Sequence, residues 1–115
     1  MKKLAAYIRL NGGATYDLNT KKYITSGYIS SKKGNELTIE GLIYYEMLID
    51  YIIEHGSDLF QPETYLGAWY DKDTNITYID TSYHFSTLEE AVKYARENDQ
   101  IKIYHLDTKS EINIK

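Results

Sequence analysis

Alternating apolar and polar residues predict strands in the first third of the chain. Over residues 3–10 the apolar positions fall on every second residue, at Leu4, Ala6, Ile8 and Leu10. A period of two is typical of a half-buried strand. The breaker NGG at residues 11–13 and the later run YITSGYISS predict a turn and a further strand. We therefore expect an antiparallel strand ribbon with basic edges over this part of the chain.

A change to three- and four-residue spacing predicts the first helix within LTIEGLIYYEMLIDYIIEHG, residues 37–56. Thr38 can cap its first turn, and Gly56 stands where a left-handed C-terminal residue is favoured. One apolar stripe at helical spacing is expected to face the core: Ile39, Leu42, Tyr45, Ile49, Ile52 and Ile53.

A second stripe on the same predicted helix carries aromatic residues and a methionine. It follows steps of three and four residues, at Tyr44, Met47, Tyr51 and His55. Acidic residues flank it, at Glu46, Asp50 and Glu54. Two interpretations are open at this point. Either the helix is buried on two sides, or the stripe binds a partner, as exposed aromatic and methionine side chains do.

The second half of the chain predicts a hairpin followed by a second helix. Residues 65–70 and 76–80 are predicted strands, joined by the turn-forming stretch DKDTN. Ser86 and Glu89 form a capping-box pattern at the start of a helix that should end near Asn98. The apolar face of this helix is expected at Leu88, Ala91, Val92 and Ala95.

Two short strands are predicted after this helix, at residues 100–106 and 111–114. The crossover from Asp80 through the helix to Ile101 would allow one parallel strand pair. The order of elements predicts an α+β fold. We expect a single domain over residues 1–115, with a mainly antiparallel sheet and two packed helices.

Length and composition exclude several classes of protein. A chain of 115 residues fits one domain that can bury a core without covalent staples. Cysteine is absent, which excludes a disulfide framework, a thiolate zinc site and a cysteine nucleophile, and suits a reducing cytosol. No stretch approaches the roughly 20 apolar residues of a membrane span. The sequence therefore predicts a soluble protein of the cytoplasm with no membrane partner.

Charge is unevenly distributed along the chain. The formal net charge is −4, but residues 1–35 carry seven basic residues and one acidic residue, a balance of +6. Residues 36–115 carry six basic and sixteen acidic residues, a balance of −10. The acidic remainder would repel phosphate, which argues against nucleic acid as the main ligand. Thirteen tyrosines suit half-buried strands and binding surfaces alike.

Candidate catalytic and metal-binding patterns lack the groups that their chemistry needs. The stretch at residues 71–75 matches the first ligands of an EF-hand loop, but Ile76 replaces the required glycine and Ser82 the bidentate glutamate. The three histidines lie on different predicted elements, without metal-ligand spacing. The nearest approach to a catalytic set, formed by Asp80, Ser82 and His84, alternates along one strand at wide spacing. The sequence therefore predicts no enzyme, no metal site and no cofactor.

Nearly the whole chain is spanned by a set of short motifs: GGATYDLNT, SGY, YLGAWYD, TYIDTS and LEEAVKYARENDQIKIYHLDT. Together they resemble a group of small proteins carried by phages, conjugative elements and their hosts. Tyr104 stands where tryptophan is commoner in that group. The resemblance implies no catalytic residue. It implies a mobile-element context, in which small acidic proteins often inhibit host defence, including anti-CRISPR proteins that place carboxylates in the nucleic-acid channel of a nuclease.

These observations lead to the hypothesis of a non-enzymatic phage or mobile-element protein that acts as an anti-defence inhibitor of the anti-CRISPR type. Its partner would be a host defence protein, such as a CRISPR effector nuclease, in the cytoplasm of the host cell. Binding would use an acidic, tyrosine-rich surface on the first predicted helix. The partner-binding residues are expected to be Tyr44, Glu46, Met47, Asp50, Tyr51 and Glu54.

Two alternatives remain open at this point. A nucleic-acid-binding accessory protein would use the basic ribbon, with stacking on Tyr23 and Tyr28. Its phosphate contacts would come from Lys21, Lys22, Lys32 and Lys33. A structural or oligomerising accessory protein would instead use the aromatic stripe of the first helix to form a homodimer.

Overall fold

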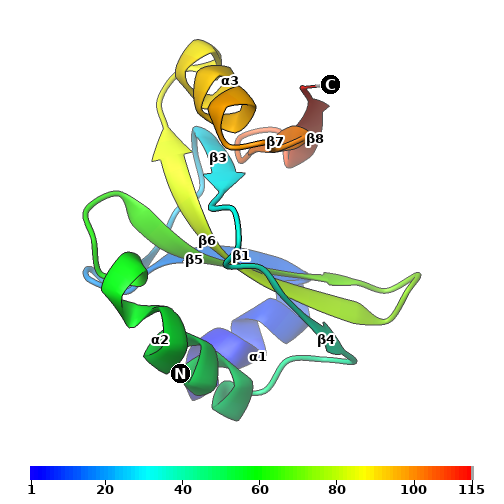
Figure 1. The fold of residues 1–115 in the computed structure, drawn as a ribbon. Helices are drawn as coiled ribbons and strands as arrows, with labels where there is room; N and C mark the ends of the chain where they lie inside the picture. The colour runs from blue at the N-terminus through cyan, green and yellow to red at the C-terminus, as the bar shows by residue number, and fades with distance from the viewer. Residues whose placement is uncertain (115) are drawn as a thin grey trace.

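The computed structural model describes residues 1–114, and within them the chain forms three helices and one eight-stranded sheet (Figure 1). In chain order the elements are α1 (Lys2–Asn11), β1 (Gly13–Asp17), β2 (Lys22–Tyr23), β3 (Tyr28–Ser31), β4 (Leu37–Glu40), α2 (Tyr45–Leu59), β5 (Thr64–Asp71), β6 (Ile76–Phe85), α3 (Leu88–Glu97), β7 (Lys102–His105) and β8 (Ser110–Asn113). All strand pairs among these residues are antiparallel. The predicted α+β class is confirmed, with one helix more than expected.

The hairpin of β5 and β6 forms the centre of the sheet, whose strand order is β2-β1-β5-β6-β3-β7-β8. The edge of β6 that faces away from β5 pairs with β4 through residues 76–79 and with β3 through residues 82–85. Because β3 lies between β6 and β7, the parallel strand pair that the crossover from Asp80 to Ile101 would have allowed does not form. β3 also lies on the far side of the hairpin from β2, so the first third of the chain does not form one ribbon.

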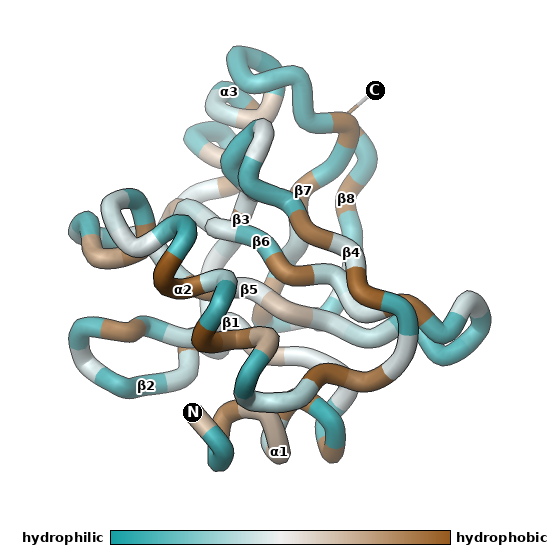
Figure 2. Tube along the Cα trace, turned by 60° about the horizontal axis from the view of Figure 1, so that its bottom comes forward, coloured by the Kyte–Doolittle hydropathy of each residue, from teal (hydrophilic) through white to brown (hydrophobic). Residues whose placement is uncertain are grey.

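The stretch DKDTN turns the hairpin between β5 and β6, as the sequence predicts. Asp71 Oδ1 accepts a hydrogen bond from the backbone N–H of Asp73 at 3.0 Å, and Asn75 takes a left-handed conformation with φ of 55°. The tip projects from the sheet and is hydrophilic (Figure 2). The side chains that match an EF-hand pattern therefore help to form a turn.

The strand predicted over residues 3–10 is wrong, because this segment forms α1. Its buried residues are Leu4, Ala5 and Ile8, at helical spacing, while Leu10 is 85% exposed. The segment consists mainly of good helix formers. Gly12 ends the helix in a left-handed conformation with φ of 81°, and its N–H donates to the carbonyl of Ile8 at 2.8 Å.

The helix predicted over residues 37–56 begins and ends later than expected. Leu37–Glu40 forms β4 on the edge of β6, and Gly41, with φ of 92°, separates this strand from α2. The helix then continues past Gly56 to Leu59 and departs from helical geometry at His55. The stripe predicted to face the core is wrong in part, because Leu42, Ile49 and Ile53 are exposed.

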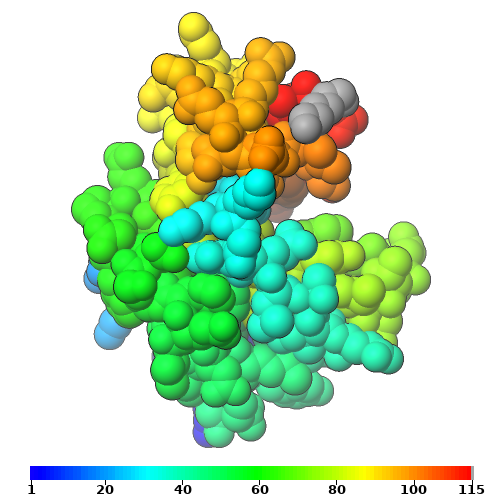
Figure 3. All heavy atoms as spheres, in the orientation of Figure 1, coloured from blue at the N-terminus to red at the C-terminus, as the bar shows by residue number. Residues whose placement is uncertain are grey.

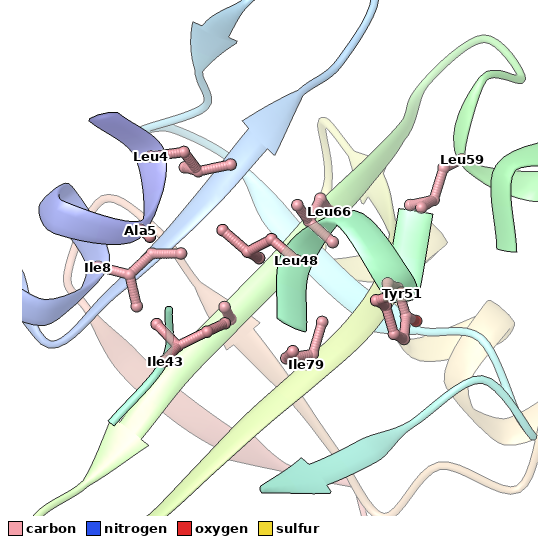
Figure 4. Close-up of a cluster of buried hydrophobic side chains, with 10 residues drawn as sticks. Leu4, Ala5, Ile8, Ile43, Leu48, Tyr51, Leu59, Leu66 and Ile79 are labelled. Carbon is pink, nitrogen blue, oxygen red and sulfur yellow. The ribbon is translucent and has the colours of Figure 1, made fainter. Parts of the chain in front are cut away.

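The main core lies between the sheet and the two helices α1 and α2 (Figure 4). From the sheet it contains Leu66 of β5 and Ile79 of β6, which point toward Leu48 and Tyr51 of α2. From α1 it contains Leu4, Ala5 and Ile8. This packing fixes which side of α2 faces inward and which side faces solvent.

α3 packs over β3, β6 and β7 and forms a second, smaller core around Ala91, Ala95 and Ile103. Its cap is shifted by one residue from the prediction. The Oγ1 of Thr87 accepts a hydrogen bond from the N–H of Glu90 at 3.3 Å and donates to the Glu90 carboxylate at 2.9 Å. The predicted end of this helix near Asn98 is confirmed.

Candidate functional site

The side of α2 that faces away from the core is the candidate functional site. Leu48, Tyr51 and Leu59 are the buried residues of the helix. The exposed side chains recur at steps of three and four residues on the opposite side, and we call five of them the α2 outer face: Glu46, Ile49, Asp50, Ile53 and Glu54. Figure 3 shows α2, in green, at the surface of the molecule.

Two isoleucines form the apolar part of the α2 outer face. Ile49 is 37% exposed and Ile53 is 76% exposed. They lie one turn apart, so their side chains are neighbours on the helix surface. Exposed apolar groups bordered by polar residues are typical of protein contact sites. Ile53 in particular adds little to the core and is free to contact another molecule.

Three carboxylates border these isoleucines along one row of the helix. Glu46, Asp50 and Glu54 follow one another at steps of four residues, about 6 Å apart along the helix axis. Within residues 1–114 no lysine or arginine forms an ion pair with them. The nearest cationic candidate is His55, whose Nε2 lies 4.0 Å from the Glu54 carboxylate. The row therefore keeps its negative charge available to a basic partner.

Tyr51 was predicted to anchor a partner, and this prediction is wrong. Its side chain is only 1% exposed. Its hydroxyl donates to the carbonyl of Asn35 at 2.7 Å and lies 3.0 Å from Thr81 Oγ1. Burial raises the pKa of Tyr51 to about 12, which keeps the hydroxyl protonated. Tyr51 thus faces inward and joins α2 to the β3–β4 loop and to β6.

Tyr44 and Met47, which were also predicted to bind a partner, lie at the border of the α2 outer face. Met47 is half-buried and packs against the main core. Tyr44 is exposed at the N-terminal cap of α2, where the guanidinium carbon of Arg9 lies 5.0 Å from its ring centroid. Arg9 Nη1 also donates to the carbonyl of Ile43 at 2.8 Å. These contacts tie the start of α2 to α1.

The last turn of α2 is held by an ion pair with the loop between β3 and β4. Lys32 Nζ lies 2.8 Å from Asp58 Oδ1, and the side chain of Asn35 donates to Asp58 Oδ2 at 3.0 Å. The hydrogen bond from Lys32, followed by the one from Asn35, lowers the pKa of Asp58. The hydrogen bond to Asp58 raises the pKa of Lys32. Both shifts favour the charged pair.

This pair predicts a specific dependence of stability on pH. A lowered carboxyl pKa stabilises the fold above about pH 3.9, the usual pKa of Asp, and the contribution is lost as pH falls through the lower folded pKa. A raised lysine pKa stabilises it below about pH 10.4, with loss above. Asp58→Asn should therefore flatten the decline in urea midpoint below pH 4. An unchanged acid profile in this variant would contradict the assignment.

Asp80, Ser82 and His84 do not converge as a catalytic triad. Ser82 Oγ donates to Asp80 Oδ1 at 2.6 Å, and Ser31 Oγ donates to Asp80 Oδ2 at 2.8 Å. The wide spacing predicted for Asp80 and Ser82 is therefore wrong. His84 Nε2 lies instead 2.8 Å from the carbonyl oxygen of Ser26. Because its two oxygens accept hydrogen bonds from Ser31 of β3 and Ser82 of β6, the Asp80 carboxylate links β3 to β6.

The sequence did not point to an aromatic pair between the central strands. Trp69 of β5 and Tyr78 of β6 stack with ring centroids 4.9 Å apart and an interplanar angle of 17°. Strand alternation places both rings on the face of the hairpin opposite Ile79, which points into the main core. Their pairing depends on strand register, which the hydropathy pattern did not specify to the residue.

The residues of the alternative nucleic-acid interface lie apart in the structure. Lys32 and Lys33 pair with Asp58 and Asp99, and Tyr28 stacks on His105 with ring centroids 4.4 Å apart. A different basic group forms where the turn between β1 and β2 approaches the start of α1. The sequence did not indicate this group, because the α1 segment was predicted as a strand.

A metal-binding cluster and a membrane-spanning helix are both absent from the described residues. Within residues 1–114, no group of three or more histidine, aspartate or glutamate side chains could hold a metal ion. None of the helices found there is long and apolar enough to cross a membrane.

Comparison with family models, curated proteins and solved structures found no match to this chain. The geometry of the α2 outer face is therefore the main observation on which a function can be proposed.

Proposed function

We propose that this protein is a non-enzymatic inhibitor of a host defence protein and that it acts through protein–protein binding by the α2 outer face. The motif resemblance to phage and mobile-element proteins supports the biological context. The proposed partner is a protein with a basic, nucleic-acid-binding channel, such as a CRISPR effector nuclease. No catalytic step is required, because occupation of the channel would itself exclude the nucleic acid.

The observation that carries this proposal is the position of Ile53. Its side chain is three-quarters exposed, next to Ile49 and beside the row of acidic side chains that have no lysine or arginine partner within residues 1–114. An apolar anchor bordered by charge is suited to binding, because burial of the anchor supplies affinity while the charges steer the partner.

The row of carboxylates explains why a basic channel is the preferred partner. Glu46, Asp50 and Glu54 present negative charge at regular intervals along a straight helix segment, as phosphates do along a strand. A channel lined with lysine and arginine would form charge-assisted hydrogen bonds with them. Such binding should weaken as salt screens the attraction, with a Debye length of about 8 Å at physiological ionic strength.

Charge reversal of the row tests this proposal. We expect the protein to inhibit DNA cleavage by at least one member of a panel of purified CRISPR effector nucleases. Asp50→Lys combined with Glu54→Lys should raise the inhibitor concentration needed by at least about 30-fold, since close charge pairs at interfaces are worth about 2 kcal/mol or more. The measurement is the cleavage rate against inhibitor concentration, at low and at high salt.

The matched control combines Asp73→Lys at the tip of the central hairpin with Glu97→Lys at the end of α3. Both double variants change the formal net charge from −4 to 0, so a difference between them reports position and not total charge. The control should inhibit as the unaltered protein does. Full activity of every nuclease in the panel, or equal loss of inhibition by the two variants, would contradict the proposal.

A further inference from the structure

A hollow between the start of α1 and the hairpin of β1 and β2 carries a second candidate site. Its volume is about 580 Å³. This falls within the range of about 300–1,000 Å³ that is usual for ligand sites. The polar and aromatic side chains that line it are Lys2, Lys3, Lys21, Tyr16 and Tyr23. Two segments that are distant in sequence therefore bring three lysines and two tyrosines to one concave surface.

The lysines of the hollow have their charge available. Within residues 1–114 none of the three forms an ion pair, in contrast to Lys32 and Lys33. Lys2 Nζ lies 5.0 Å from the ring centroid of Tyr45, which orients its side chain without neutralising it. No carboxylate lines the hollow. Its local charge is thus opposite to the net charge of the chain, and it favours an anion.

The nearest acid along the chain does not cancel this charge through an ion pair. Asp17 ends β1 next to the turn that carries Lys21. Its Oδ1 accepts hydrogen bonds from the backbone N–H groups of Asn19 at 2.8 Å and Thr20 at 3.4 Å. The carboxylate therefore shapes the turn.

The tyrosines give the hollow a rigid aromatic wall. Tyr23 stacks on Tyr7 of α1 with ring centroids 4.0 Å apart, and it meets Tyr16 edge-on at 5.1 Å. These contacts join α1 to the β1–β2 hairpin. Because the rings are already held in place, a planar ligand group that stacks on them would meet little entropic cost.

We propose that this hollow binds a nucleoside phosphate, either as a free nucleotide or as part of a single-stranded nucleic acid. The phosphate is bound by the lysines, and the base packs against the tyrosine wall. Phosphate neutralisation by lysine with stacking on aromatic rings is the usual chemistry of single-strand recognition. A simple inorganic anion would use the lysines but would leave the aromatic wall unused. The site is distinct from the α2 outer face.

Titration of the full chain with defined probes tests this inference. The probes are fluorescently labelled ATP and a fluorescently labelled 12-nucleotide oligo-dT. Binding of unlabelled pyrophosphate is measured by its competition with these labelled probes. We expect one of the two nucleoside phosphates to bind at least about tenfold more tightly than pyrophosphate, because stacking adds to the charge term. For the oligonucleotide, the slope of log affinity against log salt should be about −2, as three phosphate contacts predict.

Paired variants locate the binding. Lys3→Gln with Lys21→Gln should weaken it at least tenfold, whereas the control Lys72→Gln with Lys93→Gln, which removes the same charge elsewhere, should not. Amide shifts in NMR spectra should centre on residues 2–4, 16 and 21–23. Binding of ATP alone, or of the oligonucleotide alone, would identify the source of the nucleoside phosphate. No binding at low salt, equal affinity for pyrophosphate, or equal effects of the two variants would overturn the inference.

Discussion

Replacement of Tyr51 by alanine should lower the free energy of unfolding by about 3–5 kcal/mol, as large aromatic-to-alanine changes in cores do. The ring is 1% exposed and lies among Leu48, Leu59 and Ile79 in the main core. Its removal leaves a cavity and also deprives the carbonyl of Asn35 of its 2.7 Å hydrogen bond. Because that bond joins α2 to the β3–β4 loop, the lost packing and the lost hydrogen bond both weaken the contact between α2 and the rest of the fold.

Urea unfolding at neutral pH measures this effect, and Tyr51→Phe separates its two parts. The phenylalanine variant keeps the ring and removes only the hydroxyl, so it should cost about 1–3 kcal/mol. A loss below about 1 kcal/mol for Tyr51→Ala would contradict the burial described here, since surface substitutions usually stay within about 0.5 kcal/mol. Such a result would instead favour a surface position for Tyr51, as the sequence pattern predicted.

Replacement of Ile53 by serine should weaken partner binding by at least about 30-fold, which corresponds to the roughly 2 kcal/mol of an interface hot spot. Ile53 is the most exposed apolar residue of the α2 outer face, so its stability cost should stay within about 0.5 kcal/mol. Loss of binding without loss of stability is the signature of a contact residue. Tyr51→Ala should instead act mainly on stability, because the side chain of Tyr51 contributes to the fold and does not face a partner.

The matched control for Ile53→Ser is Ile101→Ser. Ile101 is 59% exposed just before β7, in a part of the sheet that α2 does not cover. Both variants exchange an exposed isoleucine for serine, so general changes in solubility are shared between them. Equal binding by the unaltered protein and both variants would contradict the assigned role of Ile53.

Local signals in the sequence were sufficient for several elements. The turn between β5 and β6 was predicted because the Asp71 side chain bonds to the nearby backbone and Asn75 tolerates the left-handed conformation. The second helix was predicted because its cap and its apolar face lie within one short segment, although Thr87 and not Ser86 supplies the cap. Both features involve only residues that are close in sequence, so they could be predicted without the positions of distant parts of the chain.

Non-local packing decided the features that the sequence pattern missed. The segment KLAAYIRL carries both a period of two and the helical spacing of Leu4, Ala5 and Ile8, and contact with α2 and the sheet adds to its helix propensity in selecting the helix. The first predicted helix had two apolar stripes, and the pattern could not tell which one would face the core. The inward side of α2 takes residues from both stripes: Tyr45 and Ile52 pack against the core, and Tyr51 is held there by contacts with Asn35 and Thr81, which are distant in sequence.

The candidate site depended on that choice between stripes. Glu46, Asp50 and Glu54 were predicted as partner-binding residues, and the structure places all three on the exposed side of α2. Tyr51 was misplaced for the same reason that Ile53 was missed: Tyr51 was predicted to face a partner and Ile53 to face the core, and the structure places each on the other side of the helix. The partner-binding role of the α2 outer face itself stays a prediction.

The measurement that tests the central claim most directly is a quantitative capture experiment. The immobilised protein, Ile53→Ser, the Asp50→Lys and Glu54→Lys double variant, and their matched controls are each exposed to nuclease-treated bacterial lysate, and bound proteins are quantified by mass spectrometry. We predict that a protein with a basic nucleic-acid channel is retained by the unaltered chain and the controls and lost from both α2 variants. Retention of the same proteins by every variant, or loss of all of them on nuclease treatment, would contradict the claim.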